Sequence, residues 1–236
     1  MGKDVIVALD FKTGKSALEF LDQFNRKPFV KVGMELFYSE GPDIIRELKA
    51  RGHKIFLDLK LHDIPNTVKR TMAVLSGLDV DMTNVHGAGG RPMMEAALEG
   101  LSSRREGERT LLVAVTQLTS TDQTILERDI LIKEPLEEVV MDYAKKAADC
   151  GLDGVVCSPL EAAKVHETCG KNFLTVTPGI RFEGEDTHDQ KRVMTPAMAR
   201  EAGSDYIVVG RPIIRAKDPV EAYERCLSEF VGQEGF

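Results

Sequence analysis

Eight short apolar runs rich in β-branched residues recur along the chain, and amphipathic segments with helical spacing alternate with them. This alternation is typical of a parallel sheet covered by helices, and eight strand–helix units within 236 residues match a closed barrel. The predicted strands are Val5–Asp10, Phe29–Met34, Lys54–Lys60, Asp81–His86, Thr110–Leu118, Gly154–Ser158, Phe173–Ile180 and Asp205–Gly210. The predicted helices are Ser16–Phe24, Pro42–Arg51, Thr67–Leu78, Pro92–Leu101, Pro135–Cys150, Leu160–Cys169, Thr195–Ala202 and Pro219–Phe230.

An open, doubly wound sheet is the alternative arrangement for such elements. It would need a Gly-x-Gly-x-x-Gly turn after the first strand, and Leu9-Asp10-Phe11-Lys12 contains no glycine. The similar Gly87-Ala88-Gly89-Gly90 follows the fourth strand and is more simply explained as a tight turn. Since no linker, low-complexity segment or repeat divides the chain, we expect an α/β TIM (β/α)8 barrel forming a single domain over residues 1–236.

The composition excludes several classes of protein. The formal net charge of −7 argues against a nucleic-acid partner. No apolar run approaches the roughly 20 residues of a membrane helix, and the N-terminus lacks a signal-peptide pattern. The four cysteines have no Cys-x-x-Cys spacing and the five histidines no metal-ligand spacing. We therefore expect a cytoplasmic protein with reduced cysteines, no membrane segment and no metal, with His53 and His166 at its surface.

The third predicted strand carries charges within an apolar run. Regular alternation places Asp58 and Lys60 on one face and the intervening leucines on the other. Asp63 follows within a few residues, where Pro65 breaks the strand. Burying an unpaired charge is costly, so charges here indicate a purpose. A structural ion pair at a strand end is the alternative interpretation.

Other charged residues lie near the ends of neighbouring predicted strands. Asp10 ends the first strand, and Lys31 lies in the second. Because barrel enzymes place their active sites at the carboxyl ends of the strands, we expect Lys31, Asp58, Lys60 and Asp63 to form one alternating charge array. Taken alone, Lys31 could equally be a strand-edge residue.

The last two predicted strands end in a different kind of motif. Thr177-Pro178-Gly179-Ile180-Arg181 ends the seventh strand, and Val209-Gly210-Arg211-Pro212 ends the eighth. Loops seven and eight of such barrels commonly bind phosphate. The two arginines can hold phosphate oxygens in pairs, and the proline suits the first turn of a short helix. A single arginine here would be better explained as a solvated loop charge.

The stretch from Asp58 to Thr67 (DLKLHDIPNT) closely resembles the signature of the orotidine 5′-phosphate decarboxylase family. The resemblance extends over essentially the whole chain. Further matching segments are Val7–Asp10, Lys31–Gly33, Val115–Ser120, Thr177–Arg181 and Val209–Ile213.

The resemblance implies that the chain converts orotidine 5′-monophosphate to uridine 5′-monophosphate and CO2, the last step of UMP synthesis, without metal or organic cofactor. It implies that Lys60 protonates C6 of the pyrimidine, that Asp58 lies beside the substrate carboxylate, and that Lys31 and Asp63 complete the catalytic array. It also implies a homodimer in which Asp63 and Thr67 reach the neighbouring site. The substrate-binding residues it implies are Asp10, Lys31, Thr67, Thr119, Pro178, Arg181, Gln190, Gly210 and Arg211, with Ser120 also near the base.

Two other functions stay open at this point. Sugar-phosphate decarboxylases and synthases share an Asp-x-Lys-x-x-Asp motif but use Mg2+, which would make the carboxylates metal ligands. A non-catalytic nucleotide-binding protein would explain the arginines but would not need Lys60. The polar segment Arg181–Lys191 suits a lid that closes over the phosphate, and His62 is left without a role.

Overall fold

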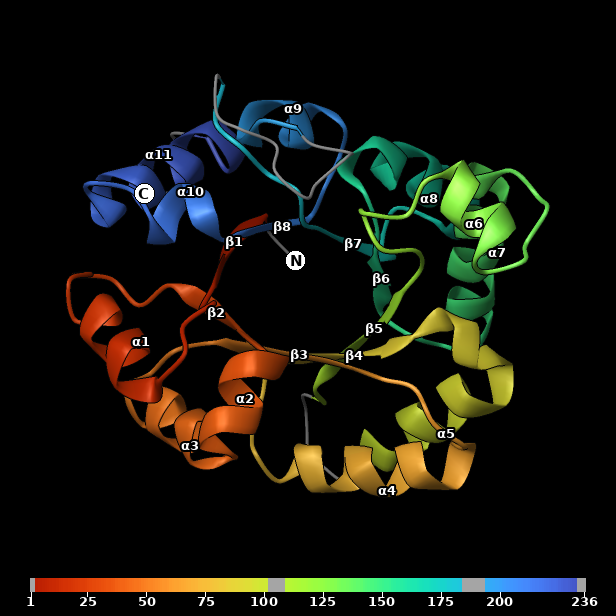
Figure 1. Cartoon of the computed structure of the whole chain (residues 1–236), viewed down its shortest axis with the longest axis horizontal. Coiled ribbons are helices and arrows are strands. Elements are labelled where there is room, and N and C mark those ends of the chain that lie inside the picture. Colours follow the sequence, from red (N-terminus) through yellow and green to blue (C-terminus); the bar gives the residue numbers. More distant parts are fainter. Residues whose placement is uncertain (1–2, 102–108, 184–193, 233–236) are drawn as a thin grey trace.

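The computed structural model describes residues 3–101, 109–183 and 194–232. Eight parallel strands close into one barrel in chain order, and helices surround it (Figure 1). The predicted TIM barrel is therefore confirmed. The strands are β1 Asp4–Ala8, β2 Phe29–Gly33, β3 Ile55–Leu61, β4 Met82–His86, β5 Leu111–Val115, β6 Gly154–Val156, β7 Leu174–Thr177 and β8 Tyr206–Val209.

Most of the helices agree with the predicted segments, and two were not predicted. The α-helices are α1 Gly14–Leu21, α2 Met34–Glu40, α3 Asp43–Ala50, α4 Pro65–Ser76, α5 Gly90–Leu101, α6 Gln123–Arg128, α7 Leu136–Asp149, α8 Ala162–Cys169, α9 Pro196–Glu201, α10 Arg211–Ile214 and α11 Pro219–Phe230. Two short 3-10 helices are η1 Gly87–Gly89 and η2 Pro159–Glu161. No helix in the described ranges is long and apolar enough to cross a membrane.

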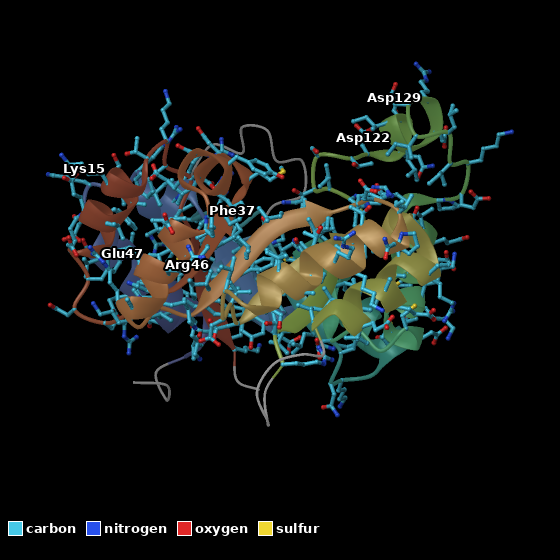
Figure 2. All side chains as sticks on the ribbon, turned by 90° about the horizontal axis from the view of Figure 1, so that it is seen from below. Lys15, Phe37, Arg46, Glu47, Asp122 and Asp129 are labelled. Carbon is cyan, nitrogen blue, oxygen red and sulfur yellow. The ribbon has the colours of Figure 1, made fainter. Side chains whose placement is uncertain are left out.

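The two unpredicted helices, α2 and α6, are short and begin in different ways. Helix α2 follows β2 directly, with Gly33 as its N-cap. Helix α6 lies within a stretch whose polar composition reads as a loop, and the Asp122 side chain caps it by accepting a hydrogen bond from Ile125 N at 2.9 Å. Figure 2 shows α6, between the labelled Asp122 and Asp129, projecting at one end of the molecule.

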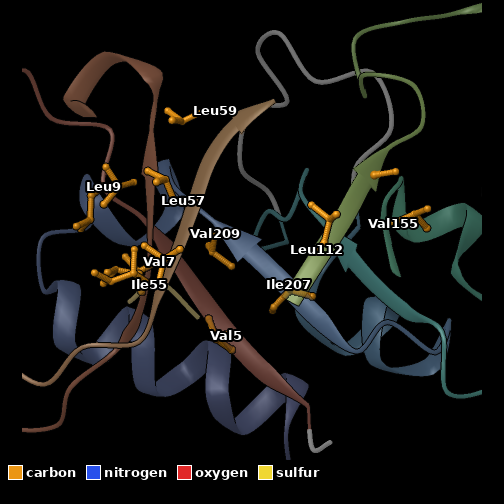
Figure 3. Close-up of a cluster of buried hydrophobic side chains, with 14 of the residues drawn as sticks. Val5, Val7, Leu9, Ile55, Leu57, Leu59, Leu112, Val155, Ile207 and Val209 are labelled. Atoms are coloured by element: carbon orange, nitrogen blue, oxygen red, sulfur yellow. The ribbon is translucent and has the colours of Figure 1, made fainter. Parts of the chain in front are cut away.

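Alternation along the strands divides the core into two layers. On β1, Val5 and Val7 point outward against the helices, whereas Ile6 and Ala8 point into the barrel. Figure 3 shows the outward layer, which includes residues of β1, β3, β5, β6 and β8. Inside the barrel, the rings of Phe29 and Tyr206 meet edge to face with centroids 6.1 Å apart. Apolar side chains make up most of both layers, so the barrel interior is a packed core and not a channel.

Aspartates at the amino ends of the strands connect neighbouring strands in pairs. Each aspartate directly precedes β4, β6 or β8. Its side chain accepts a hydrogen bond from a backbone N–H near the start of the neighbouring strand, which is β3, β5 or β7. The pairs are Asp81 with Ile55 at 2.8 Å, Asp153 with Leu112 at 2.7 Å, and Asp205 with Thr175 at 2.8 Å. A carboxylate is a strong acceptor, so these bonds help to hold the strands in register.

The prediction that His53 lies at the surface was wrong, and His166 is half-buried. His53 is only 2% exposed, and its Nδ1 lies 2.9 Å from the carbonyl oxygen of Pro28. The His166 side chain is 16% exposed, and its Nε2 lies 3.0 Å from the carbonyl oxygen of Gly203. The carbonyl of Pro28 supplies the polar partner that allows the His53 imidazole to be buried, and such a long-range partner is not visible in the sequence.

Candidate active site

Charged side chains form the top layer of the barrel interior. Each lies two residues beyond an inward-facing apolar residue of its strand, so it continues the same column toward the carboxyl end. The pairs are Ala8 with Asp10, Phe29 with Lys31, and Phe56 with Asp58. The strand period therefore carries these charges to the mouth of the barrel.

These charges alternate in sign along one connected row. Lys31 Nζ lies 3.4 Å from Asp10 Oδ1 and 3.6 Å from Asp58 Oδ2. Lys60 Nζ lies 2.6 Å from Asp58 Oδ1. The Asp58 side chain is only 12% exposed and lies between the two ammonium groups. The structure thus brings Asp10, Lys31, Asp58 and Lys60 together.

The surroundings of Asp58 keep its carboxylate ionised. Burial alone would raise the pKa of Asp58, but the charges of Lys31 and Lys60 and the hydrogen bonds from Lys60 and Asn84 outweigh burial and lower it. A fixed negative charge therefore lies beside two cations at the mouth of the barrel.

Lys60 reaches Asp58 through a bulge and not through the regular alternation that was predicted. The pairing of β3 with β4 changes register between Leu57 and Leu61, and Lys60 has a φ of 52°. This left-handed conformation is uncommon for a residue with a side chain and indicates local strain. Alternation alone could not have predicted it, because a bulge adds residues to one strand.

Asn84, on β4, completes this arrangement and was missed at the sequence level. It is fully buried, its Oδ1 accepts a hydrogen bond from Lys60 N at 2.8 Å, and its Nδ2 donates to Asp58 Oδ1 at 2.7 Å. The available signal was an amide within the apolar strand sequence MTNVH. Buried polar side chains in strands usually have specific partners, so an asparagine within this apolar run indicates a polar contact inside the barrel.

Two cavities meet at Lys31 and Pro178. One, of about 240 Å³, is lined by Lys31, Asp58 and Lys60 on one side and by Gln117, Thr119, Ser120 and apolar residues on the other. The second, of about 370 Å³, contains Asp10, Arg181, Gly210 and Arg211. A larger cavity, of about 690 Å³, lies beyond Arg181 and Arg211 toward α11 and does not reach the charged row. The first two cavities together offer space for a ligand with a planar end and an anionic end.

Glycines leave room for the charged groups of the second cavity. A Cβ at Gly210 would lie 3.3 Å from Asp10 Oδ2, and one at Gly33 would lie 3.0 Å from Lys31 Nζ. Arg181 is 8% exposed and its Nη1 donates to the carbonyl oxygen of Ile180 at 2.7 Å. Arg211 begins the short helix α10, whose second residue is Pro212, as the sequence predicted.

Asp63 and Thr67 lie apart from the two cavities within this chain. Asp63 is exposed, accepts a hydrogen bond from Ile64 N at 2.7 Å and makes no ion pair with another described residue. Thr67 is exposed in the first turn of α4. His62, which had no predicted role, stacks on His86 with ring centroids 5.5 Å apart.

Two further sequence predictions concern the lid and a metal. Gln190, and the predicted lid from residue 184 onward, lie outside the described residues. Within the described ranges, no three His, Cys, Asp or Glu side chains are grouped so that they could hold a metal ion.

Comparisons with known proteins give one consistent result. Residues 3–226 match the family model described as orotidine 5′-phosphate decarboxylase / HUMPS family. Proteins named orotidine 5′-phosphate decarboxylase from Bacillus cytotoxicus and Bacillus mycoides are 58% and 57% identical to this chain, over 98% of this chain and 99% of each relative. A solved structure of orotidine 5′-phosphate decarboxylase from Lactobacillus acidophilus has a TM-score of 0.87 at 45% identity, covering 97% of this chain and 99% of that one. An uncharacterized conserved protein from Geobacillus kaustophilus has a TM-score of 0.86 at 50% identity, covering 96% and 99%.

Proposed function

This chain belongs to the orotidine 5′-phosphate decarboxylase / HUMPS family, and from that premise we propose that it converts orotidine 5′-monophosphate to uridine 5′-monophosphate and CO2. The observation that carries the proposal is the row Lys31–Asp58–Lys60 beside two joined cavities. The reaction needs a cation and a proton donor at one carbon atom, and Lys60 offers both. The enzyme would act in the cytoplasm as part of pyrimidine nucleotide synthesis.

The joined cavities suit the two ends of this substrate. The pyrimidine would lie in the smaller cavity, against Thr119 and Ser120. The phosphate would lie in the other, held by Arg181 and Arg211, with Gly210 and Pro178 beside it and Gln190 adding a contact. Arginine is suited to this role because its planar guanidinium binds phosphate oxygens in pairs.

The ribose would lie where the two cavities meet. Asp10 and Lys31 are 3.4 Å apart there and can accept from and donate to its hydroxyl groups. This placement would bring C6 of the pyrimidine toward Lys60 and the substrate carboxylate toward Asp58. The two ends of the ligand together would then fix the reacting atoms, which is a large part of what positioning contributes to a rate.

The bond that breaks joins C6 to the carboxylate carbon. The electron pair stays on C6, CO2 leaves, and Lys60 Nζ transfers a proton to C6; solvent returns the proton to Lys60. The carbanion at C6 is poorly delocalised by the ring, so stabilisation must come from nearby charge. A preorganised ammonium in a partly buried site supplies that stabilisation without reorganisation during the reaction.

Asp58 would contribute by repelling the substrate carboxylate, and that repulsion ends as CO2 departs. Two like charges about 4 Å apart at an effective dielectric of about 20 repel by roughly 4 kcal/mol. This energy alone cannot account for a large acceleration. We infer that the fixed cation at Lys60 and binding energy from the phosphate supply most of the effect, with neither metal nor organic cofactor.

We further propose a homodimer in which Asp63 and Thr67 complete the partner's site. Both residues are exposed and do not face the cavities of their own chain. Ile64, next to Asp63, is 67% exposed, and Val74 on α4 is 69% exposed. Exposed apolar side chains on α4 and directly before it, where Thr67 and Asp63 lie, favour a protein contact there.

A spectrophotometric assay with excess EDTA tests the proposed function. We expect rapid loss of the orotate absorbance when the purified protein meets orotidine 5′-monophosphate. Loss of absorbance that needs added Mg2+ would contradict a cofactor-free reaction, and no loss with or without Mg2+ would favour a metal-dependent sugar-phosphate enzyme. Tight nucleotide binding without turnover under any condition would favour a binding protein.

A further inference from the structure

Asn84 connects the two central residues of the charged row. Its side chain is fully buried on β4 and has one hydrogen bond to Asp58 and one to the backbone of Lys60. We propose that Asn84 is a positioning residue for the decarboxylation, holding the Asp58 carboxylate and the Lys60 backbone in their reactive arrangement. The inference rests on the proposed function and adds to it a residue that does not itself contact the reacting atoms.

The chemistry of the two partners determines the orientation of the amide. Lys60 N is a donor, so it requires the amide oxygen, which lies 2.8 Å away. The Asp58 carboxylate is an acceptor, so it requires the amide nitrogen, which lies 2.7 Å from Oδ1. Reversing the amide would place two donors together and two acceptors together. An asparagine at this position can therefore satisfy both partners in only one orientation.

The bond to Lys60 replaces a strand hydrogen bond that the bulge removes. Leu57 pairs with Thr83 and Leu61 pairs with Val85, so four steps along β3 face two steps along β4. The Lys60 N–H lies within this mismatch. The Asn84 side chain satisfies it and so stabilises the left-handed backbone, with φ of 52°, that turns Lys60 toward Asp58.

The bond to Asp58 fixes the carboxylate between its two cations. Oδ1 accepts from both Asn84 and Lys60, while Oδ2 lies 3.6 Å from Lys31 Nζ. A neutral donor holds the carboxylate from the barrel side without competing for either lysine. Asn84 thus orients the charge that would face the departing carboxylate.

Asn84→Leu removes both hydrogen bonds while keeping a similar volume. We expect kcat to fall by about 10- to 100-fold, because a charged acceptor and a strained backbone N–H lose their partner. Thr83→Val is the matched control: Thr83 is equally buried on the same strand, and its hydroxyl donates to the Leu57 carbonyl at 3.0 Å. This control loses one hydrogen bond to β3 but touches no charged group, so its kcat should stay within about twofold of the parent.

Asn84→Asp separates positioning from general structural damage. When protonated, the new carboxyl can donate to Asp58 and accept from Lys60 N as the amide does. When ionised, it repels Asp58. The ratio of its kcat to that of the parent should therefore rise as the pH falls from about 8 to about 5. The same ratio for Asn84→Leu should fall with pH, because the carboxylate of Asp58 has lost a donor that favours its ionised form.

Carbon-13 NMR titration of the Asp58 carboxyl in the unliganded protein gives a readout that needs no turnover. In Asn84→Leu, Asp58 should titrate at a higher pH than in the parent. If the parent shows no turnover, the proposed function fails. The titration still tests whether the hydrogen bond from Asn84 stabilises the Asp58 carboxylate. The inference is overturned if Thr83→Val lowers kcat as much as Asn84→Leu does. It is also overturned if the ratio of the Asn84→Asp kcat to the parent kcat does not change with pH, or if Asp58 titrates at the same pH in Asn84→Leu as in the parent.

Discussion

Replacing Lys60 with methionine should destabilise the folded protein by leaving Asp58 with too little positive charge. Lys60 Nζ lies 2.6 Å from Asp58 Oδ1, and the carboxylate side chain is 12% exposed. Methionine has a similar length but no charge. In Lys60→Met the buried carboxylate would keep Lys31, at 3.6 Å, as its cationic neighbour.

The distance sets an upper limit on the effect. At an effective dielectric of about 20, charges 2.6 Å apart attract by about 6 kcal/mol. Removing Lys60 also removes its own desolvation penalty, and its side chain is 28% exposed, so much of this attraction is offset. Because Lys31 still compensates part of the charge, we expect the free energy of unfolding at neutral pH to fall by about 2–4 kcal/mol.

The pH dependence of this loss has a defined sign. In the parent, the pKa of Asp58 is below its usual value, so its stabilising contribution is present above the unfolded-state pKa and disappears as the pH falls through the folded-state pKa. Without Lys60 the folded-state pKa of Asp58 rises, so acidification removes less stability from the variant. The difference in stability between the two proteins should therefore shrink as the pH falls from about 7 to about 4.

Urea denaturation followed by circular dichroism at both pH values measures these differences. Lys164→Met is the control, because Lys164 pairs with Glu137 at the exposed surface and should matter far less. Asp58→Asn combined with Lys60→Met should recover stability, since the uncompensated charge is gone. An equal loss at both pH values, or a double variant no more stable than Lys60→Met, would refute this reasoning.

Three further changes test other parts of the molecule. Arg181→Ala should lower kcat as well as raise KM in steady-state assays, reducing kcat/KM by about 100-fold or more. A change in KM alone would contradict the idea that binding of the phosphate contributes to catalysis. Lys60→Ala and Asp63→Ala chains, each inactive alone, should regain activity when unfolded and refolded together, and persistent inactivity would argue against a shared site. Gly100→Ala should reduce the free energy of unfolding in urea by about 1–3 kcal/mol, because its Cβ would lie 2.3 Å from the Lys69 carbonyl oxygen; unchanged stability would show that α4 and α5 separate easily.

The sequence predicted the barrel because strand and helix periodicities are local properties. Asp10, Lys31 and Asp58 were expected at the mouth because they lie in or at the ends of the predicted strands, and the structure adds that each continues an inward-facing column of its strand. Helix α2 was missed because it follows β2 without a separating loop, and α6 because its polar sequence resembles a loop. Local composition does not show where β2 ends and α2 begins, nor that a polar stretch such as that around α6 is helical.

The two hydrogen bonds of the Asn84 side chain could not be predicted from strand periodicity. Its partners, Asp58 and Lys60, lie 26 and 24 positions away, and one bond exists only because β3 bulges. A period of two cannot predict the residue at which a strand departs from that period. The stacking of His62 on His86 is likewise a contact between the ends of different strands.

The aspartates at the amino ends of β4, β6 and β8 have a consequence for how this chain can change. Their hydrogen bonds link β3 to β4, β5 to β6 and β7 to β8 at the end of the barrel opposite the charged row. These side-chain bonds therefore reinforce the strand pairing at one rim, while the proposed active site lies at the other. Changes in the loops at the carboxyl rim leave these three hydrogen bonds untouched, so new chemistry can be explored there while the reinforced rim keeps its strand contacts.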